Sequence, residues 1–111
     1  MCVSNPVNTV CADAFSYGPR ATSIDVTHSP SPDTYGWKRI YATNLERLYN
    51  GHWNAVETKS GNYRYSVTNS FSLAARLPGT YRLVINYTLY DASGAYHHHD
   101  TMFHPTFEVY R

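Results

Sequence analysis

The sequence predicts an all-β domain of about seven short strands, arranged as a sandwich or a small barrel. Runs of β-branched and aromatic residues are separated by Gly, Pro and Asn turn signals at intervals of roughly 8–14 residues, and no run has the length and periodicity of a stable helix. Apolar types make up 42% of the 111 residues, which is enough for one core, while only 15% are charged. We therefore expect a single domain.

The longest predicted strand lies in residues 77–91. It opens at the turn pair Pro78-Gly79 and then contains neither Gly nor Pro. Because side chains alternate along a strand, its odd-numbered residues should face the core. These residues are Tyr81, Leu83, Ile85, Tyr87 and Leu89.

The start of this strand carries a family resemblance. The spacing Leu77-x-Gly79-x-Tyr81-x-Leu83 resembles the tyrosine corner of immunoglobulin-like sandwiches. The resemblance implies an immunoglobulin-like antiparallel β-sandwich in which the Tyr81 hydroxyl bonds back to the preceding corner. Leu83 stands where that family has a buried Cys, so the resemblance is to the architecture and not to antibody domains.

The N-terminal third predicts an arm followed by the domain itself. Residues 1–20 should form an irregular arm or an edge strand around residues 7–10, and residues 21–111 should form the sandwich. The first regular strand is expected at residues 21–28, where Ile24, Val26 and His28 alternate with polar residues. Two prolines in the segment after His28 end this strand.

Residues 37–50 could form a strand or, around residues 44–48, a helical turn. We favour a strand with a bulge near residues 45–48, because the Asn50-Gly51 pair is a hairpin signal for a type I′ turn. The returning strand, residues 52–58, would place Trp53 in the core as the large central aromatic.

The C-terminal half continues as turns and strands. Turns are expected at residues 59–62 and 92–95, and strands at residues 63–67, 71–75 and 97–110. In the last strand Phe103, Phe107 and Val109 should share one face, while Pro105 indicates an edge position or a bulge.

The two cysteines, Cys2 and Cys11, could close a disulfide loop in an oxidising compartment. They could equally be free thiols of a cytosolic or virion protein. Their spacing does not match a zinc finger.

Charge and hydropathy exclude two classes of partner. The net charge is +1, and no basic stripe typical of nucleic-acid binding is present. No apolar run has the ~20 residues of a membrane span, and the polar start of the chain does not resemble a signal peptide. We expect an extracellular, cell-surface or virion location, with the cytoplasm as the alternative.

The histidine-rich segment, residues 96–100, offers two interpretations. On an extended strand His97 and His99 would point to one side, and His104 could complete a Zn or Cu site. The favoured interpretation is a polar loop between the last two strands.

No catalytic motif is visible, and we predict that the protein is not an enzyme. A Gly-x-Ser-x-Gly elbow is absent, and the carboxylates show no spacing typical of a glycosidase pair.

The abundance of tyrosine leads to the functional hypotheses. Eleven tyrosines supply rings with a polar tip, which suit half-buried strand faces, protein interfaces and sugar platforms. The first hypothesis is a non-catalytic structural module of a surface, secreted or virion assembly, which binds a protein partner or its own copies through Tyr-rich faces. The alternative is a carbohydrate-binding module with a platform of exposed rings, and metal binding is the third. The candidate platform residues are Tyr35, Trp37, Tyr49, Tyr90 and Tyr96.

Overall fold

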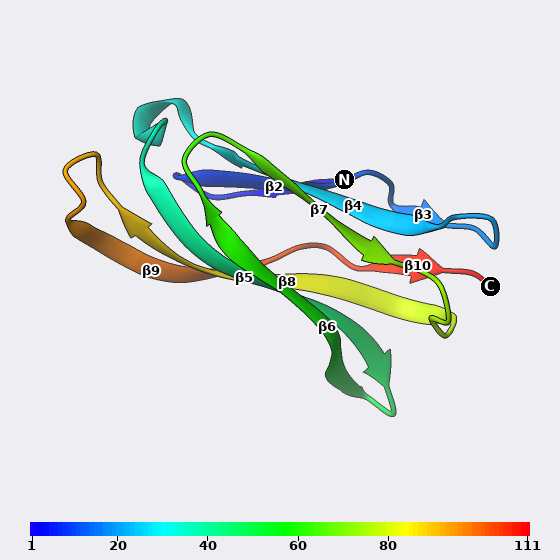
Figure 1. Ribbon diagram of the computed structural model, residues 1–111. Coiled ribbons are helices and arrows are strands. Elements are labelled where there is room, and N and C mark those ends of the chain that lie inside the picture. The colour runs from blue at the N-terminus through cyan, green and yellow to red at the C-terminus, as the bar shows by residue number, and fades with distance from the viewer.

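The computed structural model describes all 111 residues as two β-sheets packed face to face (Figure 1). The four-stranded sheet has the order β1 (Cys2–Ser4), β2 (Asn8–Ala12), β4 (Ser23–Pro30) and β7 (Val67–Ser72). The six-stranded sheet has the order β3 (Ser16–Tyr17), β10 (Phe107–Val109), β8 (Gly79–Tyr90), β5 (Lys38–Tyr49) and β6 (His52–Tyr63), and β9 (Tyr96–Phe103) also pairs with β8. The all-β, two-sheet prediction is confirmed. The expected number of about seven strands was wrong, because the structure has ten, several of them only two or three residues long.

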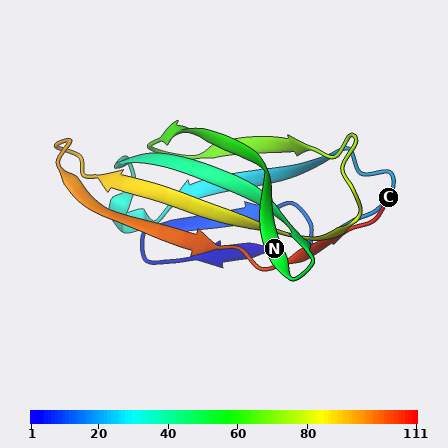
Figure 2. The same cartoon turned by 90° about the horizontal axis from the view of Figure 1, so that it is seen from below.

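The strands of both sheets run along the long axis of a body measuring 46 × 26 × 19 Å (Figures 1 and 2). Every strand pair is antiparallel except β3 and β10, which are parallel. A single 3₁₀ turn, η1 (Pro32–Thr34), lies between β4 and β5. No helix in the structure has the length and apolar character that crossing a bilayer requires.

The core lies between the two sheets, and β8 contributes most of its large side chains. The odd-numbered residues of β8 from Tyr81 to Leu89 are at most 2% exposed, as strand alternation predicts. The hydroxyl of Tyr81 donates a 2.6 Å hydrogen bond to the carbonyl oxygen of Leu77, four residues upstream. The predicted bond back to the corner is therefore present.

The first twenty residues contribute to both sheets. They contain the edge strands β1 and β3, while β2 lies between β1 and β4. Four of their side chains belong to the core: Val7, Val10, Ala12 and Tyr17. The segment expected as an arm or an edge strand thus also supplies an inner strand.

The hairpin of β5 and β6 has the predicted turn but not the predicted core tryptophan. Asn50 and Gly51 both have positive φ, at 52° and 76°, which a type I′ turn requires. Leu45 pairs with Glu57 and Glu46 with Ala55, so Val56 is an unpaired bulge residue. The bulge reverses the alternation beyond it. Trp53 therefore lies on the outer face, and its expected place in the core was wrong.

The turn expected at residues 59–62 was also wrong, because β6 continues to Tyr63. Gly61 pairs with Tyr41, and a Cβ at Gly61 would lie 3.3 Å from the Tyr41 hydroxyl oxygen. The glycine makes room for this ring inside a continuous strand. The chain passes to the other sheet at residues 64–66, and β7 then runs without a break.

The last predicted strand is divided into β9 and β10. Residues 104–106 interrupt it, and this irregular segment changes which side chains face the core. Phe103 is 57% exposed on the outer face, whereas Phe107 and Val109 are 2% and 1% exposed. The expected common face for all three residues was wrong. The histidines of residues 97–99 lie in β9 and not in a loop.

Candidate functional site

The outer face of the six-stranded sheet, turned away from the other sheet, carries an area without any Asp, Glu, Lys or Arg. The strand register aligns twelve side chains there in three rows that cross β6, β5, β8 and β9. The rows are Asn62-Ile40-Thr88-His99, Ser60-Ala42-Asn86-Thr101 and Thr58-Asn44-Val84-Phe103. We call these twelve residues the outer patch.

Polar side chains of the outer patch bond to one another across the strands. Thr58 Oγ1 donates to Asn44 Oδ1 at 2.7 Å, and Thr101 Oγ1 donates to Asn86 Oδ1 at 2.6 Å. These bonds use hydrogen-bonding groups that would otherwise need water. Removing water from the patch therefore costs less free energy than its Thr and Asn content suggests.

One end of the outer patch is bordered by a neutralised charge pair between aromatic rings. Arg82 Nε donates to Glu46 Oε1 at 2.8 Å. The Arg82 guanidinium lies 4.3 Å from the ring centroid of Trp53 and 5.3 Å from that of Phe103. Such stacking holds the guanidinium close to the sheet.

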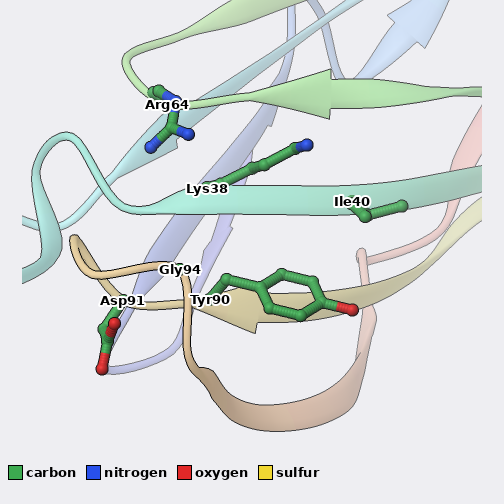
Figure 3. A pocket seen from close by; sticks show the side chains of 6 residues that line it. All are labelled: Lys38, Ile40, Arg64, Tyr90, Asp91 and Gly94. Atoms are coloured by element: carbon green, nitrogen blue, oxygen red, sulfur yellow. The ribbon is translucent and has the colours of Figure 1, made fainter.

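A pocket of about 280 Å³ opens at the other end of the patch (Figure 3). Its lining comes from β5, the β6–β7 turn, β8 and the β8–β9 turn, and consists of Lys38, Ile40, Arg64, Tyr90, Asp91 and Gly94. Hydrogen bonds from Ser93 and from the Ala95 amide lower the pKa of Asp91. Sequence reasoning missed Lys38, Arg64 and Asp91, because they are far apart in the chain and match no motif.

The five predicted platform rings do not form one surface. Tyr35 (64% exposed) and Tyr96 (63%) lie near the pocket end, whereas Tyr49 lies at the opposite end of β5. Trp37 is partly buried against the core. Tyr90 lines the pocket, with its ring centroid 6.2 Å from that of Tyr96.

Five of the eleven tyrosines are buried. None of the twelve residues of the outer patch is a tyrosine, and most of them are Thr, Asn or Ser. The buried tyrosines are Tyr17, Tyr41, Tyr63, Tyr81 and Tyr87. Burial raises the pKa of Tyr63 to about 12. These hydroxyls are structural groups of the core.

The structure separates the three histidines considered as Zn or Cu ligands. Leu89 pairs with His98 and Tyr90 with Tyr96, so His97 is the extra residue of a bulge in β9. Its Nδ1 lies 3.0 Å from Nδ1 of His98. His99, by contrast, lies on the outer face, with Nδ1 3.1 Å from Thr88 Oγ1. The bulge removes the common side that an unbroken strand would give His97 and His99.

His104 is buried at a distance from the other histidines. Its Nε2 lies 2.8 Å from the carbonyl oxygen of Met1, and its Nδ1 lies 2.8 Å from that of Pro105. Both ring nitrogens therefore lie against backbone carbonyl oxygens of the chain. The structure contains no group of three His, Cys, Asp or Glu side chains that could hold a metal ion.

Cys2 and Cys11 form a disulfide that links β1 to β2. The two residues are direct partners in the strand register. The bond fixes the edge strand β1 against the sheet.

A buried arginine, which sequence reasoning missed, joins the loops at the pocket end. Arg39 is 0% exposed and donates through Nε to Asn8 Oδ1 at 2.7 Å. Its Nη1 donates to the carbonyls of Thr34 and Trp37, and its Nη2 donates to the Val7 carbonyl and to Thr34 Oγ1. All five N–H groups have neutral acceptors, and burial lowers the pKa of Arg39. The sequence could have indicated its burial, because Arg39 is an odd-numbered residue of β5 and the odd-numbered residues from Tyr41 to Leu45 face the core.

A buried histidine lies on the facing sheet. His28 is 0% exposed, and its Nε2 lies 3.4 Å from Thr43 Oγ1. Its Nδ1 has no partner within the protein, and its ring contacts Tyr41 and Tyr63. Burial lowers the pKa of His28 to about 4.

No protein-family model matches this chain, and no curated protein sequence matches it.

Proposed function

We propose that this chain is a non-catalytic interaction module that associates with a second copy of itself through the outer patch. The observation that supports this best is the absence of Asp, Glu, Lys and Arg from all twelve residues of the patch. Depletion of charge distinguishes the centre of protein interfaces from the rest of a surface.

The shape of the outer patch suits packing of one sheet on another. Short side chains such as Ala42, Ser60 and Thr101 form its middle row, so a facing sheet could approach to about 10 Å. An uncharged surface also meets its own copy without repulsion, as a two-fold contact requires.

The size of the face favours reversible association. With the adjoining pairs Glu46-Arg82 and Leu48-Trp53, the sixteen side chains cover about 520 Å² in projection, from a rise of ~3.4 Å per residue and a strand spacing of ~4.8 Å. Specific interfaces commonly bury about 800 Å² per partner. We therefore expect a weak dimer whose population depends on protein concentration.

The test is sedimentation velocity over a concentration series. The wild-type protein should show a rising weight-average mass, and Ser60→Arg should remain a monomer because it introduces a charge into the middle row. Asn54→Arg is the matched control, since Asn54 is an exposed residue of the same strand β6 outside the patch. A monomer at every wild-type concentration would contradict the proposal.

The proposal extends to the finer fold assignment, an immunoglobulin-like topology. Two features support it. One is the hydrogen bond from Tyr81 to Leu77, and the other is that the chain passes from the four-stranded to the six-stranded sheet between β4 and β5 and again between β7 and β8. A location outside the cytoplasm is proposed from the Cys2–Cys11 disulfide. Thiol alkylation with a mass tag on freshly lysed host cells tests it, because a cytoplasmic protein would be labelled at both cysteines.

A further inference from the structure

The pocket beside the outer patch combines the features of a small-ligand site. Four separate segments converge on about 280 Å³, close to the lower end of the volumes usual for ligand pockets. Figure 3 shows Tyr90 on β8, Ile40 and Lys38 on β5, and Arg64 on the side of β5 away from Tyr90. A ligand there would meet an apolar surface and positive charge together.

The two cations of the pocket have no acidic partner. The ion pairs of the chain join Lys59 and Arg76 to Glu57, and Arg82 to Glu46. Neither Lys38 nor Arg64 takes part in them.

Arg64 is nevertheless oriented at the pocket. Its Nη1 donates a hydrogen bond to the Gly36 carbonyl oxygen at 3.2 Å, which anchors the guanidinium while its other N–H groups stay free. An unpaired, oriented guanidinium is suited to binding a carboxylate or a sulfate.

Asp91 lines the pocket but does not face its cationic side chains. Its Oδ1 accepts hydrogen bonds from the amides of Ser93 and Ala95 and from the Ser93 hydroxyl. Figure 3 shows the carboxylate directed away from Tyr90, Lys38 and Arg64. An anion is therefore directed to Lys38 and Arg64, away from the Asp91 carboxylate.

We propose that this pocket binds an acidic saccharide, a sugar carrying a carboxylate or a sulfate. The acidic group lies between Lys38 and Arg64, and the C–H face of the sugar ring packs on Tyr90 and Ile40. Tyr96 supports the Tyr90 ring edge-on, at 6.2 Å between centroids. A purely neutral glucan would leave both cations unused, and nucleic acid, which binds along a basic stripe, would find no such stripe beyond them.

The test is affinity electrophoresis and calorimetry with two acidic probes and one neutral probe. Polygalacturonate supplies carboxylates, chondroitin sulfate supplies sulfate esters as well, and dextran supplies neither. We expect saturable binding to at least one acidic probe and none to dextran, and the comparison of the first two identifies the acidic group. Equal binding to dextran, or no binding to either acidic probe, would overturn the proposal.

Variants locate the binding at the pocket. Lys38→Gln and Arg64→Gln should each weaken it about two- to fivefold, as expected for loss of a partly exposed ion pair. Lys59→Gln, which removes a cation of the same sheet already paired with Glu57, is the matched control and should bind as the wild type does. Tyr90→Ala should weaken binding, and Tyr49→Ala at the far end of β5 should not.

The same variants keep this inference separate from self-association. Lys38→Gln lies outside the three rows of the outer patch and should leave the sedimentation behaviour unchanged while it weakens sugar binding. Ser60→Arg should do the reverse. If Lys38→Gln bound the acidic probe as tightly as the wild type does, the site would be wrong whatever the oligomeric state.

Discussion

The inner and outer faces of the six-stranded sheet are built by alternate residues of the same strands, yet they differ in what they do. On β5, the inner residues Arg39 and Leu45 are both 0% exposed, while the outer residue Ile40 is 46% exposed. Inner side chains fill the core and form hydrogen bonds with buried polar groups. Outer side chains contribute little to either.

This difference makes the outer composition informative. A strand face turned to water is normally polar and readily accepts Lys or Glu. The outer patch accepts neither, although nothing in the core requires their absence. This composition is the reason why we propose self-association through the charge-free face.

The largest expected effect comes from removing the buried cation of the inner face. Arg39→Met should lower the free energy of unfolding by about 4 kcal/mol, because it removes the five hydrogen bonds of the guanidinium at about 1 kcal/mol each. Asn8 Oδ1 and the carbonyl oxygens of Val7 and Thr34 each keep another donor. Urea unfolding measures the change.

Arg47→Met is the matched control on the same strand. Arg47 donates only to the carbonyl of Pro78, in an exposed position. Its replacement should cost less than about 1 kcal/mol. Equal losses of unfolding free energy in the two variants would mean that the buried hydrogen bonds of Arg39 stabilise the protein no more than the exposed ones of Arg47.

The second largest effect is the pH dependence of stability that buried His28 causes. With a pKa of about 4 in the folded state and 6.5 when unfolded, His28 stays neutral on folding while the unfolded chain takes up a proton. Its contribution is complete above pH 6.5 and is lost as the pH falls towards 4. The expected loss is about 3 kcal/mol, at ~1.36 kcal/mol per pKa unit.

The measurement compares unfolding free energies of wild type and His28→Leu across pH 4–7. The difference between the two proteins isolates the contribution of His28 from that of all other groups in the chain. If the two pH profiles run parallel, His28 is not protonated on unfolding as proposed.

The two faces also explain what sequence could predict. Alternation assigned β8 correctly because no irregularity interrupts it between Tyr81 and Leu89. The same rule failed for Trp53 and Phe103, because the bulge at Val56 and the break after Phe103 each change the alternation. These irregularities depend on pairing with other strands, which no local pattern records.

The candidate sites show the same limit. Tyr90 was among the predicted rings, but the cations beside it come from residues 38 and 64, on other segments of the chain. Sequence neighbours such as His97 and His99 are, by contrast, separated by a one-residue bulge. Proximity along the chain was a poor guide to proximity at the surface.

A smaller effect concerns the tyrosine corner at the edge of the inner face. Tyr81→Phe removes the 2.6 Å bond to the Leu77 carbonyl and should cost about 1 kcal/mol. Tyr110→Phe is the control, since Tyr110 is 54% exposed. Thermal and urea unfolding should agree, and a corner variant as stable as the control would remove the energetic role of this bond.

The smallest effect comes from the substitution Thr→Val, made once on the outer face of β6 and once on the inner face of β5. Thr58→Val on β6 breaks the exposed bond to Asn44 and should change the unfolding free energy by less than about 0.5 kcal/mol, because water replaces the lost partner and Val suits a strand. Thr43→Val on β5 is nearly isosteric but removes the only partner of buried His28 Nε2, and should cost about 1 kcal/mol. If Thr58→Val were the more damaging change, the outer bonds would belong to the folding core, and the charge-free face would need no partner to explain it.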